Sequence, residues 1–130
     1  QELKRNGFDD IIVVNDGSSA EYLDIFERAK QMDCKVLQHA VNLGKGRALK
    51  NGFNEFLNLY QDNPDILGII TVDSDGQHAV KDVIQIDDWW KKNKCAELLL
   101  GSRNWQEYPL RAGQVIRLQV RCTVYYTEFK

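Results

Sequence analysis

Two aspartates, one residue apart, directly follow an apolar run in this sequence. The run Ile69–Val72 predicts a buried strand, and Asp73 and Asp75 would lie where that strand leaves its sheet. Side chains repeat every second residue in extended backbone, so both carboxylates would face the same way. Hard oxygen ligands of this kind suit Mg²⁺ or Mn²⁺. The spacing therefore predicts a divalent metal site, with a solvated turn as the alternative.

Other groups that could bind a ligand also follow predicted strands. They are Asp16, the loop Gly44–Arg47 and Arg103. The carboxyl ends of strands in an open α/β sheet border one crevice, so we predict that acids and cations converge there. Each residue taken alone has a plainer interpretation: Asp16 as the cap of the next helix, and the cations as solvated surface charges. His78 fits a metal ligand or a residue that orients a neighbour.

These groups depend on alternating strands and helices for their positions. Apolar runs predict strands at residues 10–15, 35–38, 67–72 and 95–100. Helical spacing predicts helices at residues 20–32 and 79–92. It also predicts a helix that begins within residues 44–48 and extends to residue 60. Residues 1–7 are typical of a helix end stopped at a glycine, and a weak stripe favours helix from 114 to about 126. This order predicts an α/β fold with a doubly wound, mostly parallel, Rossmann-like sheet.

Composition limits the class of protein. A chain of 130 residues suits one domain, and its net charge of −2 argues against nucleic-acid binding. The cysteines Cys34, Cys95 and Cys122 form no metal-binding spacing, which favours a reducing cytoplasm. The sequence has neither a run long enough for a transmembrane helix nor a signal peptide at its start.

Four motifs together resemble family 2 glycosyltransferases with the GT-A fold. The motifs are Val13–Ser19, Asn42–Ala48, Val72–His78 and Gly101–Arg103, in matching order and spacing. Within the family, the chain most resembles the polyprenyl-phosphate sugar synthases of the dolichol-phosphate mannose or glucose synthase type. The resemblance implies a hexosyltransferase with a UDP- or GDP-sugar donor, a polyprenyl (lipid) phosphate acceptor, and Mg²⁺ or Mn²⁺.

The resemblance also implies roles for single residues. Metal ligands would be Asp73, Asp75 and Gln77, and catalytic groups would be Asp75, Arg103 and Arg117. Residues that contact the substrate would be Asn15, Asp16, Gly17, Gly44, Lys45, Asp73 and Ser74. Any membrane contact would come through parts of the full-length protein outside this chain, at the cytoplasmic face.

The sequence departs from the family pattern at both ends. Nothing before Asp10 matches the family's first strand, and the family continues beyond the position of Lys130. We therefore expect residues 1–130 to be a single, incomplete GT-A domain. Two other classes share the strand and helix order but not the motifs: a receiver-like signalling domain phosphorylated on Asp73, which also needs an early acidic pair and a late lysine, and a sugar-phosphate nucleotidyltransferase, which needs a glycine-rich loop after its first strand.

Overall fold

The computed structural model describes residues 1–66, 68–73, 78–93, 99–100 and 123–124. The chain divides into two compact units, Gln1–Asn63 and Pro64–Lys130. The prediction of one domain over residues 1–130 stays a prediction. Among the described residues, no helix is both long and apolar enough to cross a bilayer.

A pair of parallel strands forms the centre of the first unit. Strand β1 (Ile12–Asn15) pairs with β2 (Lys35–Gln38), and both lie within the predicted ranges. The register places Ile12 opposite Lys35 and Asn15 opposite Gln38, so the two strands end together. The residues that follow each strand therefore emerge side by side at one edge.

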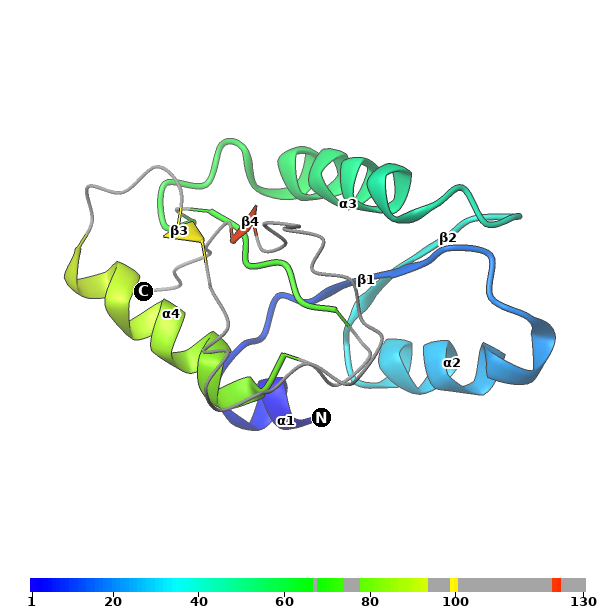
Figure 1. Ribbon diagram of the computed structural model, residues 1–130, viewed down its shortest axis with the longest axis horizontal. Helices are drawn as coiled ribbons and strands as arrows, with labels where there is room; N and C mark the ends of the chain where they lie inside the picture. Colours follow the sequence, from blue (N-terminus) through cyan, green and yellow to red (C-terminus); the bar gives the residue numbers. More distant parts are fainter. Residues whose placement is uncertain (67, 74–77, 94–98, 101–122, 125–130) are drawn as a thin grey trace, which may run out of the picture. The chain divides into compact units, whose positions relative to one another are not determined.

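Helices cover this strand pair on opposite sides (Figure 1). On one side lie the short 3₁₀ helix η1 (Ala20–Tyr22) and α2 (Leu23–Gln31), and on the other lies α3 (Lys45–Tyr60). These bounds confirm the predicted helices. An apolar stripe at helical spacing needs a surface to cover, and the strands provide one on each face.

Small residues and caps set the positions of these helices. A Cβ added at Gly52, which is buried in α3, would lie 3.4 Å from Cγ2 of Val14, an ordinary van der Waals contact, so α3 packs directly on β1 here. The first helix, α1 (Glu2–Arg5), ends before Gly7, whose φ of 84° suits a glycine after a helix. This ending confirms the predicted stop.

In its described residues, the second unit has a helix and a short strand pair. Helix α4 (Val80–Lys92) confirms the helix predicted at 79–92, and it buries Val83, Asp87 and Trp90. The Nζ of Lys91 donates to Oδ2 of Asp87 at 2.9 Å, which satisfies the buried carboxylate one turn away. Strands β3 (Leu99–Leu100) and β4 (Thr123–Val124) pair antiparallel.

Two predictions of secondary structure were wrong where the structure describes the chain. Residues 68–73 form neither strand nor helix, although a strand was predicted at 67–72. An apolar, β-branched run favours extended backbone, but a strand also requires a neighbour that continues the hydrogen-bond ladder. Residues 123–124 form a strand where a helix was favoured, because β-branched Thr123 and Val124 suit a ladder with β3. Residues 67, 74–77, 94–98, 101–122 and 125–130 lie outside the described part.

Candidate functional site

The site begins with Asn15, the last residue of β1. Its side chain is 0% exposed, and its Nδ2 donates to Oε1 of Gln38 at 2.6 Å. Its Oδ1 accepts the backbone N–H of Ser18 at 2.9 Å, which imitates a backbone turn. Asn15 thus holds the turn after β1 and ties it to the end of β2. Its predicted contact with substrate stays a prediction.

Gly17 lets this turn approach the loop that follows β2. Its φ is 69°, and a Cβ placed on it would lie 2.2 Å from the carbonyl carbon of Val41 and 2.3 Å from the nitrogen of Asn42. Only a residue without a Cβ fits both the backbone angle and the space. The close approach therefore joins two loops that the strand register has already brought to one edge.

Asp16 lies between these loops and binds the second one. Its Oδ1 accepts the backbone N–H of Leu43 at 2.9 Å and lies 2.8 Å from Nδ1 of His39. The hydrogen bond with His39, followed by backbone N–H groups of Leu43 and Gly44, holds the pKa of Asp16 below its ordinary value. The N-cap of η1 is Ser19, and no side-chain bond caps that helix. The plainer interpretation of Asp16 as a helix cap is therefore wrong.

His39 connects Asp16 to helix α3. Its Nε2 lies 2.8 Å from Nδ2 of Asn51, and its side chain is 9% exposed. The Asn51 amide nitrogen can only donate, so Nε2 accepts and Nδ1 carries the ring proton toward Asp16. We call these three residues the Asp16–His39–Asn51 chain. His39 and Asn51 were not predicted from the sequence, where the available signal was that His39 directly follows its strand as Asp16 follows the neighbouring one.

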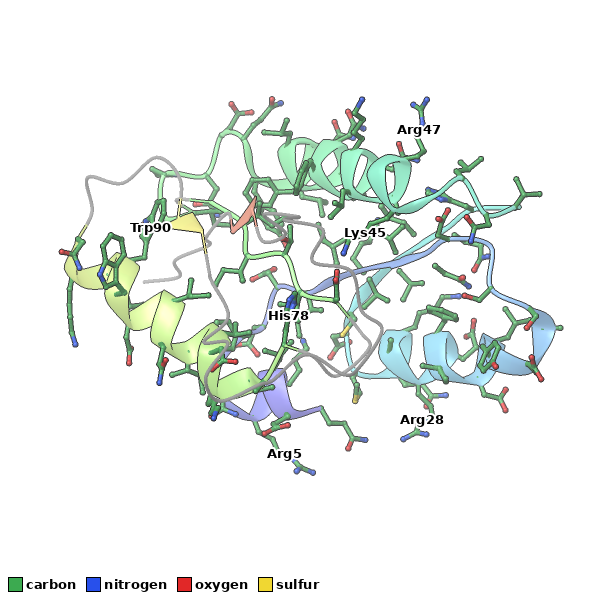
Figure 2. All side chains as sticks on the ribbon, in the orientation of Figure 1. Arg5, Arg28, Lys45, Arg47, His78 and Trp90 are labelled. Atoms are coloured by element: carbon green, nitrogen blue, oxygen red, sulfur yellow. The ribbon has the colours of Figure 1, made fainter. Side chains whose placement is uncertain are left out.

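The start of α3 lies on the same loop. Gly44 precedes the helix with φ 85°, and its N–H donates to Oδ1 of Asn42 at 2.9 Å. The helix begins at Lys45, as predicted, so its positive end lies directly after Gly44 and two residues after Leu43. Figure 2 shows Arg47 on the outer side of α3, away from the strands, and Lys45 on the side that faces them. Of these two cations, Lys45 is therefore the better placed to reach a ligand bound at the strand ends.

The predicted metal motif lies in the second unit and is described only at its ends. The Asp73 N–H donates to Nδ1 of His78 at 3.0 Å. His78 therefore orients the backbone of Asp73, which agrees with the prediction that it orients a neighbour. Within the described ranges, no group of three or more His, Cys, Asp or Glu side chains could hold a metal ion. The remaining predicted residues, Ser74, Asp75, Gln77, Arg103 and Arg117, lie outside the described residues.

The structure thus brings together one half of the predicted crevice. Within the first unit, Asp16 contacts Leu43, and Gly17 lies against Val41 and Asn42. The predicted approach of Asp73 to these groups stays a prediction, as do the roles of the individual site residues.

A match to a protein-family model decides the family. Residues 2–111 match the model of glycosyl transferase family 2. This chain belongs to that family. Together with the parallel strand pair between helices, the match fits a doubly wound fold of the GT-A type. It favours the glycosyltransferase interpretation over the receiver-like and nucleotidyltransferase alternatives.

One relative among the curated proteins is an uncharacterized protein, MJ1222, of Methanocaldococcus jannaschii. The two sequences are 42% identical over 86 residues, which are 66% of this chain and 32% of the relative. The match thus spans about a third of the length of that relative. No solved structure matches the chain at a significant level.

Proposed function

We propose that this chain is the donor-binding part of an enzyme that transfers a sugar from a UDP- or GDP-linked donor to an acceptor. The observation that carries the proposal is the Asp16 carboxylate, held after β1 by a hydrogen bond from Leu43. Ligands of open α/β sheets bind outside the carboxyl ends of the strands, where this carboxylate lies. Membership of family 2 supports the reaction class.

The nucleotide would be bound by the groups on the two strand-end loops. Asp16 would accept hydrogen bonds from N–H groups of the base or from hydroxyl groups of the ribose. Its lowered pKa favours the ionised form, which acts purely as an acceptor. The positive end of α3, at Gly44 and Lys45, would attract the diphosphate. Asp16 is hydrogen-bonded to the loop that carries this helix end, so a nucleotide that reaches Asp16 would have the helix end beside it.

A divalent cation, Mg²⁺ or Mn²⁺, is the proposed cofactor, with Asp73, Asp75 and Gln77 as its ligands. Carboxylate and amide oxygens form the hard donor set that these cations prefer. The bond from the Asp73 N–H to His78 supports this proposal, because it holds the backbone at the first ligand. When bound, the cation would neutralise the leaving diphosphate as a Lewis acid.

The finer proposal is hexosyl transfer to a polyprenyl phosphate. Such a phosphate is already ionised near neutral pH, so the chain would need no strong base to activate it. Arg103 and Arg117 would contact the donor or acceptor phosphate, since planar guanidinium groups suit phosphate oxygens. Contact with a membrane would come through other parts of the full-length protein.

Calorimetric titration of the full-length protein with UDP, GDP and their sugar conjugates tests this proposal. We expect one nucleotide class to bind with Mn²⁺ and to bind at least about tenfold more weakly in EDTA, the scale of one charge-assisted contact. Asp73→Ala should reproduce the effect of EDTA. Asp88→Ala, at an exposed position of the same unit, serves as the matched control. Binding of neither nucleotide class by the wild type would reject the proposal.

A further inference from the structure

The Asp16–His39–Asn51 chain runs from helix α3 to a carboxylate that solvent can reach. Asn51 belongs to α3, and His39, which lies between the other two residues, is only 9% exposed in its side chain. The Asp16 side chain is 20% exposed, so the chain opens to solvent at the carboxylate. A buried polar network costs free energy unless each member is hydrogen-bonded. In this network the hydrogen bonds hold a carboxylate that is partly exposed to solvent.

The two oxygens of Asp16 are not equivalent. The hydrogen bonds from His39 and Leu43 both reach Oδ1, at 2.8 and 2.9 Å, and Oδ2 takes part in neither. Two donors from different residues fix the rotation of a carboxylate better than one, because a single bond leaves the group free to turn about it. Within the part of the chain that the structure describes, this arrangement leaves Oδ2 as the oxygen that can accept from a ligand.

We propose that His39 is a positioning residue of the nucleotide site, which fixes the Asp16 carboxylate so that Oδ2 faces the nucleotide. This inference rests on the proposed function, and it adds a residue that touches no substrate. Asn51 assists by donating to Nε2, which sets the ring proton on Nδ1 and fixes the plane of the ring. His39 therefore acts through Asp16.

Substitutions of His39 that retain only one of its two hydrogen-bonding positions distinguish a role in orienting Asp16 from a role in packing. In His39→Asn, the amide nitrogen can take the place of Nδ1 and still donate to Asp16. In His39→Gln, the longer side chain places its amide near Nε2, toward Asn51, and leaves Asp16 without its donor. His39→Leu keeps much of the volume and neither nitrogen. Glu55→Gln is the control, because it weakens the β2–α3 ion pair with Lys35 (3.1 Å) without touching Asp16.

The first measurement is the dissociation constant of UDP and GDP for the full-length protein in the presence of Mn²⁺. The second is KM and kcat for the donor sugar, measured in an assay of sugar transfer. We expect His39→Leu and His39→Gln to raise the dissociation constant about tenfold, the scale of losing a hydrogen bond to a charged group. His39→Asn should stay within about threefold of the wild type, and Glu55→Gln should match the wild type. The effect should fall on KM rather than on kcat.

Each outcome decides a separate point. Wild-type nucleotide binding that His39→Leu leaves unchanged would overturn the positioning role and leave the proposed function standing. Equal losses in His39→Asn and His39→Leu would show that the imidazole serves packing alone, and would also overturn the role. A wild type that binds neither UDP nor GDP would overturn the proposed function and this inference with it.

Discussion

Nδ1 of His39 lies 2.8 Å from Oδ1 of Asp16, although the two residues are 23 positions apart in the sequence. The strand register produces this contact, because Asn15 pairs with Gln38 and each partner is followed by one member of the pair. A second link supports the alignment: the His39 N–H donates to the Asn15 carbonyl at 2.9 Å. Backbone pairing thus sets the geometry of the side chains at this edge.

Replacing Asp16 tests its contact with the nucleotide directly. Asp16→Asn keeps the shape and removes the charge, so we expect nucleotide affinity to fall by about tenfold to a hundredfold, as for a hydrogen bond to a charged group. Calorimetry with UDP and GDP measures the change. Asp62→Asn, at an exposed position after α3, is the matched control and should bind as the wild type does. Equal affinity in Asp16→Asn and the wild type would exclude this carboxylate from the site.

The pKa of Asp16 should depend on His39. The hydrogen bond from His39 is the largest cause that lowers this pKa below 3.8, whereas burial raises it. His39→Leu should therefore move the pKa upward, and His39→Asn should keep it low. Carboxyl carbon shifts followed by NMR against pH give the value without any ligand. An unchanged pKa in His39→Leu would show that the ring does not donate to the carboxylate.

The same shift sets an acid limit on stability. A carboxyl with a lowered folded-state pKa stabilises the fold fully above its ordinary value of 3.8. That contribution is lost as the pH falls through the lower folded-state value. Urea unfolding at a series of pH values across this window measures the effect. As the pH falls, the free energy of unfolding should decrease less in His39→Leu than in the wild type.

Gly17 should tolerate no side chain. Gly17→Ala combines a φ of 69° with a Cβ 2.2 Å from the Val41 backbone, and we expect it to lower the free energy of unfolding by about 3 kcal/mol. Gly7→Ala is the control, because Gly7 has φ 84° and no neighbour within 4 Å of an added Cβ. It isolates the cost of the backbone angle, about 1 kcal/mol. Urea denaturation compares them, and equal losses would show that the contact with Val41 gives way easily.

Tyr60 should stabilise the first unit in a pH-dependent way. Its hydroxyl donates to Oδ1 of Asp10, and burial, followed by this bond, raises its pKa from 10 to about 12. A raised pKa gives stability that is complete below pH 10 and is lost as the pH rises through about 12. Tyr60→Phe should lower the free energy of unfolding at pH 7 by about 1 kcal/mol and remove this alkaline loss.

Two controls accompany the Tyr60 measurement. The substitution keeps the ring that packs against Phe56, with centroids 5.6 Å apart, so the hydroxyl alone is tested. Tyr22→Phe alters an exposed tyrosine of η1 and should change stability by less than about 0.5 kcal/mol. An unchanged alkaline transition in Tyr60→Phe would contradict the role of the bond to Asp10.

Local patterns in the sequence were sufficient for helices α2, α3 and α4 and for the first two strands. Apolar β-branched runs identified β1 and β2, and helical spacing identified α2, α3 and α4. These elements depend on which face of each segment is apolar, and that property is written in consecutive residues. The four motifs also led to the family that the match over residues 2–111 confirmed.

The sequence by itself determined that Asp16 follows a strand and that Gly44 and Lys45 open a helix. Only the tertiary structure decided that His39 and Asn51 join Asp16, and that residues 68–73 form no strand. The reason is physical: a register, a ladder or a side-chain hydrogen bond needs a second segment whose position no local pattern specifies. The carboxylate was visible in the sequence, and the groups that orient it became visible only when β1 and β2 were paired.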